Sequence, residues 1–144
     1  MASYINGRTY PFDVSFDFPH NPRSPMVHVE MSTSNGGDQK PVSGKMDTGA
    51  QTTILDFNTA RTLGIENPKR GYMATGICYT ATGQPIQCYQ HRVFIYVRNS
   101  HGLSLQTVLY PGFAEEISCN FFGMDWTNDY CLAFGCHSVH LLHS

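Results

Sequence analysis

The chain has 144 residues, 41% of them hydrophobic and 14% charged, which suits one domain with a single core and excludes long charged helices or coiled coils. Its formal charge of −2, from nine Lys and Arg against eleven Asp and Glu, provides no basic face of the kind that nucleic-acid backbones require. Thirteen Gly and eight Pro indicate short strands joined by many turns.

Residues 1–25 are expected to form an N-terminal arm or an extra strand ahead of the main domain, residues 26–144. Phe12, Phe16 and Phe18 alternate with polar residues, which predicts a strand, and the prolines that follow predict a kinked linker. An added strand, a dimer arm and a removable pro-segment are the three alternatives for this segment.

Two hairpins and a short helix are predicted next. Apolar residues alternate with polar ones from residue 26, and the sequence at 34–38 is typical of a hairpin turn leading to a return strand at 42–46. Asp56 is the predicted N-cap of a helix over residues 57–63, with Gly64 as its stop. Residues 72–97 hold extended runs around Gly76 and Gly83 and predict a long β-hairpin.

Three further segments are also predicted to form strands. They lie at residues 103–109, 131–134 and 139–142, with a break at Pro111-Gly112 and an acidic turn at Glu115-Glu116. Many short strands with one or two short helices predict an all-β, barrel-like domain.

The segment most informative for function is 46–54, which places Asp47 in a tight turn between two apolar strands. Gly49 allows backbone amides to approach the carboxylate, and Thr48 can pack or hydrogen-bond beneath it, so the Asp47 side chain is held in place. A plain Asx-turn, in which Asp47 caps its own backbone, is the alternative explanation.

Three landmarks in chain order resemble the retropepsin family, the single-lobed aspartic proteases of retroviruses, retroelements and some cellular proteins. The landmarks are Asp47-Thr48-Gly49-Ala50 after an apolar strand, the glycine-containing flap sequence Ala74-Thr75-Gly76-Ile77-Cys78-Tyr79, and Phe121-Phe122-Gly123-Met124-Asp125-Trp126. The resemblance covers residues 26–134 and implies the acid-protease fold, a closed β-barrel with a flap hairpin. The Gly-Met-Asp-Trp part is similar to the version in gypsy-type retroelement proteases.

The resemblance also implies roles for individual residues. Asp47, Thr48 and Gly49 would form the catalytic motif, with Thr48 bonding across a dimer axis and Gly49 lining the substrate floor. Ala50 and the flap, centred on residues 76–79, would bind the substrate. The segment Phe121-Phe122-Gly123 would pack against the catalytic loop. No metal and no organic cofactor is implied.

Hydrolysis of a peptide by carboxylates needs two of them, one to take a proton from water and one to protonate or hydrogen-bond the scissile carbonyl. The chain carries one Asp-Thr-Gly, so the expected enzyme is a twofold homodimer in which Asp47 of each subunit meets at the axis. It is expected to be an aspartic endopeptidase acting on an extended peptide. The alternative is a retropepsin-like peptide-binding module with weak or absent hydrolysis.

Two departures from the retroviral pattern affect the dimer and the flap. Met124 stands where retroviral enzymes usually carry Arg or a similar polar residue, which removes a charged dimer contact. Cys78 and Tyr79 make the flap sequence bulkier and poorer in glycine, which would stiffen or reshape it.

The cysteines and histidines are expected to be structural. Five cysteines form an odd set without a signal peptide or membrane span, which favours free thiols in a reducing compartment, the cytoplasm. The C-terminal stretch 136–143 holds Cys136, His137, His140 and His143, a possible metal-binding set. Their spacing along a strand would point His137 and His140 to opposite faces, so a terminal strand without metal is preferred. Val139, Leu141 and Leu142 are candidates for a dimer-interface sheet.

Overall fold

The computed structural model of the chain describes residues 3–5, 8–10, 12–17, 25–80, 82–99, 102–134 and 138–143. The strands are β1 (Ser3–Ile5), β2 (Arg8–Tyr10), β3 (Phe12–Asp17), β4 (Met26–Ser32), β5 (Lys40–Met46), β6 (Ile54–Asp56), β7 (Ala74–Tyr79), β8 (Pro85–Gln90), β9 (Val93–Arg98), β10 (Ser104–Leu109), β11 (Gly112–Ala114), β12 (Phe121–Phe122), β13 (Cys131–Phe134) and β14 (Ser138–His143). The helices are α1 (Phe57–Thr62) and α2 (Met124–Thr127). Within these described residues, neither helix has the length and apolar character needed to cross a membrane.

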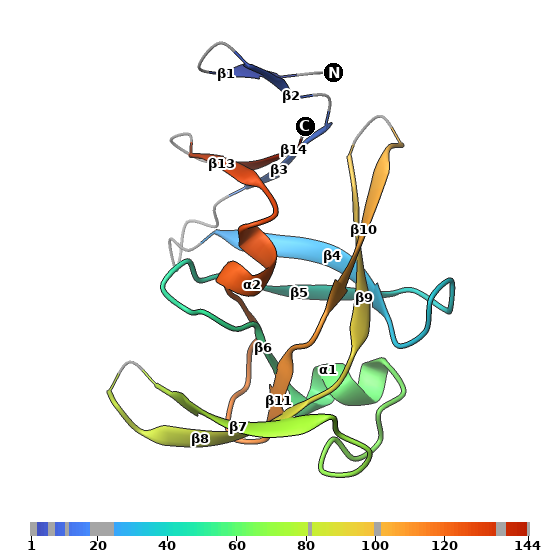
Figure 1. Cartoon of the computed structure of the whole chain (residues 1–144), viewed down its shortest axis with the longest axis vertical. Helices are drawn as coiled ribbons and strands as arrows, with labels where there is room; N and C mark the ends of the chain where they lie inside the picture. The colour runs from blue at the N-terminus through green and yellow to red at the C-terminus, as the bar shows by residue number, and fades with distance from the viewer. Residues whose placement is uncertain are drawn as a thin grey trace.

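Nine strands form one sheet in the order β10-β9-β4-β5-β12-β6-β11-β8-β7, and this sheet curls into a half-barrel (Figure 1). The expectation of an all-β domain with a hairpin and one or two short helices is therefore confirmed, although the sheet is a half-barrel and not the expected closed barrel. The strand pair β7–β8 extends from one end of the sheet as a separate arm, while β9 and β10 extend toward the other end of the molecule (Figure 1).

Alternation of apolar and polar residues explains the central hairpin β4–β5. Val27, Val29 and Met31 are buried whereas His28 is exposed, as expected for a strand with one face on the core. The strands pair antiparallel from Met26 opposite Lys45 to Met31 opposite Lys40, which confirms the predicted hairpin.

The second predicted hairpin is placed differently. Residues 72–97 do not form one long hairpin, because β9 pairs with β4 and β10 instead of continuing the β7–β8 pair. The turn between β7 and β8 lies at 80–84, where Thr80 N donates to Gln84 O at 2.9 Å, and Gly83 has a φ of 83°. Gly76 and Tyr79 lie within the strand, so the prediction that the flap centres on residues 76–79 is wrong. Gly83 is the glycine whose positive φ the turn requires.

Helix α1 begins at the predicted residue and ends at Thr62, one residue before the predicted limit of 63. The Asp56 side chain accepts a hydrogen bond from Thr59 N at 2.7 Å, so it caps the helix N-terminus. Leu63 is the C-cap, and Gly64 follows with a φ of 91°, a conformation that favours glycine.

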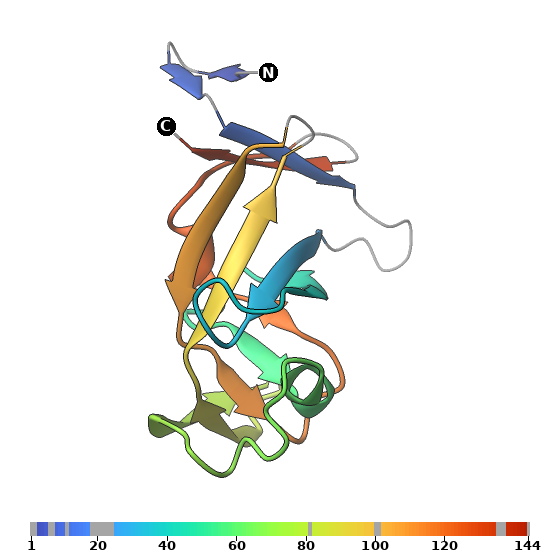
Figure 2. The ribbon, with the colours of Figure 1, turned by 90° about the vertical axis from the view of Figure 1, so that its right-hand side faces the viewer.

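A separate sheet of three strands, in the order β13-β14-β3, lies across one end of the nine-stranded sheet (Figure 2). Strand β3 pairs with β14 from Phe12 opposite His143 to Asp17 opposite Ser138, so part of the first 25 residues joins the end of the chain. His140 Nδ1 lies 2.9 Å from Asp13 Oδ1 and links the same two strands.

The burial of two β14 side chains argues against the dimer-interface role predicted for this strand. Leu141 and Leu142 are 0% and 1% exposed within the single chain, so they present no free apolar surface to a partner. The side chain of Val139, together with Cys136 and His137, lies outside the described residues.

The core beneath the three-stranded sheet is aromatic. Phe122, Trp126 and Tyr130 follow one another with ring centroids 5.2 and 5.3 Å apart, and Trp126 is fully buried. Burial, with a smaller contribution from the charge of Asp129, raises the pKa of Tyr130 to about 12. This stack fixes the position of α2 against the sheet.

Asn120 connects three elements through its side-chain amide. Its Nδ2 donates to Ser43 O at 2.9 Å, and its Oδ1 accepts from Asp56 N at 2.9 Å and from Thr59 Oγ1 at 3.1 Å. The residue is 6% exposed, so no solvent replaces these bonds. Asn120 therefore ties β5, β6 and α1 together directly behind the loop that carries Asp47.

Replacement of Asn120 by alanine should lower the free energy of unfolding by about 2 to 3 kcal/mol, because buried partners on three elements lose their hydrogen bonds. The measurement is urea denaturation followed by the fluorescence of Trp126, the single tryptophan of the chain. Asn58→Ala is the matched control, since the exposed Asn58 side chain accepts a hydrogen bond only from the exposed Arg61 side chain in the described structure. Equal losses in both variants would contradict the role given to Asn120.

Candidate active site

The loop between β5 and β6 holds Asp47 through its own backbone and through β12. Asp47 N donates to Phe122 O at 2.8 Å, and Ala50 N donates to Asp47 O at 3.1 Å, which closes a tight turn. Gly49 N donates to Asp47 Oδ1 at 3.0 Å. This last bond is the Asx-type contact considered above, and within the described residues it leaves Asp47 Oδ2 without a hydrogen bond.

The second half of the loop is held by Thr53, whose side chain is fully buried. Thr53 Oγ1 donates to Asp125 Oδ1 at 2.7 Å and accepts from Gly123 N at 3.1 Å. Thr53 N donates to Asp125 Oδ2 at 2.9 Å, so both oxygens of Asp125 are engaged. A hydrogen bond to a carboxylate is stronger than one between neutral groups, which makes this pair the firmest polar link between the loop and α2.

Gly123 allows the two segments to approach closely. A Cβ on this residue would lie 2.8 Å from Ala50 O and 2.7 Å from the carbonyl carbon of Thr52. Two backbone bonds span the same junction, from Met124 N to Ala50 O at 2.8 Å and from Asp125 N to Gln51 O at 3.1 Å. The expected packing of the Phe-Phe-Gly segment against the Asp47 loop is therefore observed.

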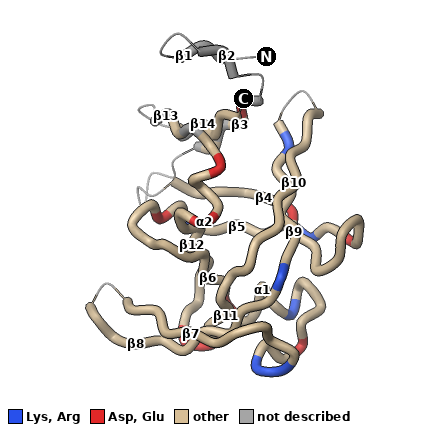
Figure 3. Tube along the Cα trace, in the orientation of Figure 1, with Lys and Arg blue, Asp and Glu red and all other residues tan. Residues whose placement is uncertain are grey.

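A cleft of about 550 Å³ separates the Asp47 loop from the β7–β8 hairpin. The loop side, β6 and the segment around β12 contribute Asp47, Ala50, Gln51, Thr52, Ile54, Ile117 and Phe121, and the hairpin contributes Ile77, Cys78, Tyr79, Thr80 and Ile86. Asp47 is the one acidic residue in this lining of described residues. Strands β7 and β8 carry no Lys, Arg, Asp or Glu and are drawn entirely in tan in Figure 3.

The structure brings together some of the predicted site residues. Asp47, Ala50, Ile77, Cys78 and Tyr79 line the cleft. Thr48 and Gly49 lie in the same loop and are exposed beside Asp47. The other three predicted residues, Ala74, Thr75 and Gly76, lie in the first half of β7, are exposed and fall outside the cleft lining.

Seven lining residues are absent from the sequence-based prediction. Gln51 and Thr52 directly follow the Asp47 motif, so their position in the sequence could have predicted that they line the cleft. Thr80 directly follows the predicted Tyr79, whereas Ile54, Ile86, Ile117 and Phe121 come from four other segments that meet only in the folded chain. The apolar character of these four residues matches that of a surface that receives uncharged side chains.

Two cysteines lie at the edge of the cleft. Cys78 and Cys88 have their Sγ atoms 3.0 Å apart, and Cys88 is 2% exposed. Burial, followed by the hydrogen bond and the charge of Cys78, raises the pKa of Cys88 to about 12. Cys88 is therefore a neutral thiol across the physiological range, and this argues against it as the catalytic nucleophile of a cysteine protease.

Metal chemistry finds no support in the described part of the chain. No group of three or more His, Cys, Asp or Glu is placed there to hold an ion. Of the C-terminal set, His140 contacts Asp13, and the ring of His143 lies 6.1 Å from that of Tyr130.

Comparison with solved structures bears on the fold. A retropepsin-like aspartic protease from Rickettsia conorii superposes with a TM-score of 0.61 and 11% identity, covering 92% of this chain and 91% of that one. The chain has the retropepsin-like fold. The retroviral protease-like domain of Ddi1 from Leishmania major aligns with a TM-score of 0.44 and 17% identity, over 77% of this chain and 82% of that one. No protein-family model matches the sequence, and no curated protein shows significant sequence similarity to it.

Replacement of Thr53 by valine, which has nearly the same shape, should lower the free energy of unfolding by about 2 to 4 kcal/mol, since Gly123 N and the Asp125 carboxylate lose a buried partner. Urea denaturation monitored by Trp126 fluorescence measures the loss. Thr62→Val is the control, because Thr62 is exposed and its hydroxyl bonds only to Asn58 O, so its change should stay within about 0.5 kcal/mol. A near-zero change in the free energy of unfolding for Thr53→Val would show that the Thr53–Asp125 bonds do not stabilise the fold.

Proposed function

We propose that the chain is an aspartic endopeptidase that acts as a twofold homodimer, with Asp47 of each subunit supplying one carboxylate of the catalytic pair. The observation that carries the proposal is the position of Asp47 in the retropepsin-like fold. Its Oδ1 is held by Gly49 N, and the side chain lines an apolar cleft beneath a hairpin. A carboxylate fixed in this way is oriented for proton transfer to or from a bound water.

The chemistry requires two carboxyl groups that share one proton. One carboxylate removes a proton from the attacking water while the other, protonated, donates to the scissile carbonyl oxygen. Two carboxylates about 3 Å apart do not both ionise readily, so the pair as a whole is singly protonated across an acidic to near-neutral window. No metal or organic cofactor enters this reaction.

A second copy of the chain is the source of the second carboxylate. Asp125 is remote from the motif in sequence but contacts its loop in the fold, and both its oxygens accept hydrogen bonds from Thr53. Asp47 is the only acid among the described lining residues. Thr48 and Gly49 are exposed next to it, so the loop has an uncovered side at which a symmetry-related loop can bind.

The proposed substrate is an extended peptide of about six to eight residues with apolar side chains at the cleaved bond. The isoleucines at 54, 86 and 117 and Phe121 supply apolar contacts in the cleft. Strand β7 is the last strand of its sheet, so one side of its backbone is free to pair with a peptide in the described structure. A peptide that pairs with an open strand edge gains main-chain hydrogen bonds regardless of its sequence.

The same open edge favours a second candidate function, a peptide-binding module that does not hydrolyse its ligand. In this case β7 adds a peptide strand, and Asp47 acts only as the cap of its own turn. Ala74, Thr75, Gly76 and Ile77 are exposed along β7, which suits strand addition. Replacement of Asp47 distinguishes the two functions, because hydrolysis requires its carboxylate and strand addition does not.

The Asp47→Asn variant should lose cleavage of a diverse peptide mixture by about 10³-fold or more between pH 4 and 7, because asparagine retains the oxygen for Gly49 N but exchanges no proton. Wild-type activity should rise faster than linearly with protein concentration where monomer and dimer coexist. Mass spectrometry of the products measures both effects and gives the residues preferred at the cleaved bond. Pepstatin, which resembles a tetrahedral intermediate, should inhibit the wild type.

Asp38→Asn is the matched control, since Asp38 is an exposed carboxylate in the turn between β4 and β5. It should cleave at the wild-type rate. Equal cleavage by the wild type and Asp47→Asn would refute the mechanism. Absence of cleavage at concentrations where the protein is dimeric, combined with peptide binding unchanged in Asp47→Asn, would establish the binding module instead.

A further inference from the structure

The β7–β8 hairpin brings two cysteines into contact on one of its faces. Cys78 is paired with Ile86 and Gly76 with Cys88, so the two cysteines are diagonal neighbours across the antiparallel pair. Their Sγ atoms lie 3.0 Å apart. Residues directly opposite or diagonal in such a pair share a face of the sheet, so the contact is built into the strand register and does not depend on a flexible loop.

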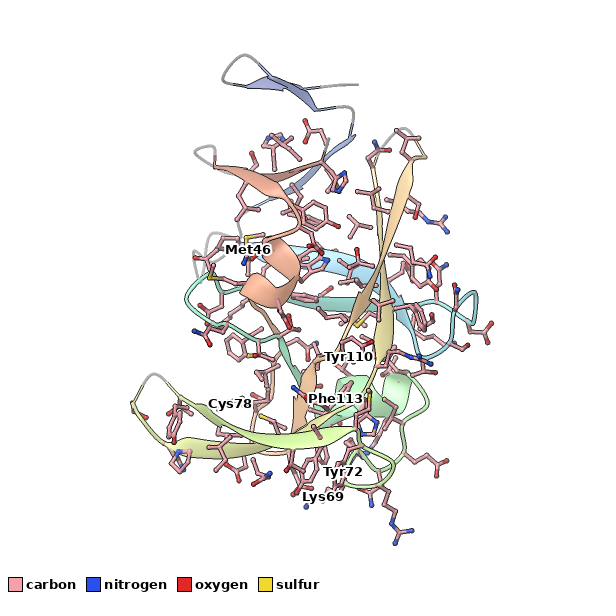
Figure 4. The ribbon with its side chains drawn as sticks, in the orientation of Figure 1. Met46, Lys69, Tyr72, Cys78, Tyr110 and Phe113 are labelled. Carbon is pink, nitrogen blue, oxygen red and sulfur yellow. The ribbon has the colours of Figure 1, made fainter. Side chains whose placement is uncertain are left out.

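The surroundings of the pair are apolar and closely packed. Cys88 forms a small buried cluster with Ile86 and Ala114, and the partly buried Cys78 packs against this cluster. Gly112 on β11 lets the Cys88 side chain approach closely, because a Cβ at residue 112 would lie 2.9 Å from Cys88 Cβ. Figure 4 shows Cys78 on the side of the hairpin that faces the rest of the domain. The thiols are thus held together between the hairpin and the body.

The two thiols differ in access. Cys78 is half-buried and lines the cleft, whereas Cys88 is 2% exposed. Burial, followed by the hydrogen bond and the charge of Cys78, raises the pKa of Cys88 to about 12, so Cys88 is the less reactive of the two thiols toward an oxidant. A small oxidant entering the cleft therefore meets Cys78 first, and Cys88 is placed as the resolving thiol.

We propose that Cys78 and Cys88 form a reversible disulfide, a redox modification site that cross-links the two strands of the hairpin beside the cleft. The oxidant is hydrogen peroxide. The Cys78 sulfur, as thiolate, attacks a peroxide oxygen, the O–O bond breaks, and Cys78 becomes a sulfenic acid while the released hydroxide leaves as water. The Cys88 sulfur then attacks Cys78 Sγ, the S–O bond breaks, and the hydroxyl group leaves with the Cys88 proton as a second water. Two thiols lose two electrons and two protons, and the peroxide is reduced to water.

Formation of the disulfide should change the geometry of the hairpin. A disulfide requires an S–S separation of about 2.05 Å, so the two sulfurs must approach by about 1 Å from their present contact. Diagonal neighbours are also spaced more widely at Cα, about 7 to 8 Å, than most disulfides, so closure draws β7 toward β8. Oxidation therefore tightens the hairpin and fixes the cleft-lining side chain of Cys78. Any effect on cleavage rests on the proposed protease function.

The experiment treats the full chain with hydrogen peroxide, blocks remaining thiols by alkylation under denaturing conditions, and digests with trypsin. Cleavage after Arg70 and Arg92 releases peptide 71–92, which contains Cys78 and Cys88 and no other cysteine. The oxidised peptide should carry no alkyl group, and a dithiol reductant applied before alkylation should restore two. Alkyl groups are counted instead of total mass, because Met73 in the same peptide can gain oxygen.

Controls and a second measurement make the test independent of the protease proposal. Cys119→Ser should behave like the wild type, whereas Cys78→Ser should leave Cys88 open to alkylation in peptide 71–92. The Asp47→Asn background should give the same thiol result, because the dyad takes no part. Hydrogen exchange of amides in residues 74–90 should slow about tenfold on oxidation. Two alkyl groups at a peroxide exposure that oxidises Cys119, or unchanged exchange in the bridged protein, would overturn the proposal.

Discussion

The bond pair between Thr53 and Asp125 is the constraint on which the rest of the site depends. It joins the loop that carries Asp47 to the helix α2 that follows β12, and it is buried on the Thr53 side. Gly123 lets the two backbones come close enough for this bond to form. The Asp47 carboxylate is therefore positioned by residues remote from it in sequence, which is the usual way in which a fold fixes a reactive group.

Asn120 also holds the loop in place, because its side chain joins the two strands and the helix that flank the loop. Its side-chain amide links β5, β6 and α1 by hydrogen bonds, in place of backbone hydrogen bonds that these three elements do not form with one another. The aromatic stack of Phe122, Trp126 and Tyr130 then fixes α2 from the core side. The loop is thus held by polar contacts at its ends and by apolar packing beneath, which leaves its Asp47 side uncovered toward the cleft.

Much of this fold could be predicted from sequence because its signals are local. Alternating residues gave β4 and β5, and Asp56 with Gly64 gave the limits of α1. The placement of the hairpin turn failed, since two glycines were available and sequence does not say which one needs a positive φ; Gly83 does. Strand β11 was missed because Gly112, Phe113 and Ala114 are all buried and show no alternation. Ile86 and Ile117 join the cleft only through tertiary packing, and a carboxylate from a second chain leaves no trace in one sequence.

The pairing of β3 with β14 has a consequence for how the chain folds. Asp13 and His140, which link these strands, are separated by 127 positions, so closing this contact costs more chain entropy than closing the hairpin β4–β5. During synthesis Asp13 of β3 is made 127 positions before His140, so β3 must wait for the intervening chain before its partner strand exists. The three-stranded sheet is therefore expected to assemble last, after the curled sheet and its loop are in place, and an unpaired β3 edge is the surface most exposed to misassembly during that interval.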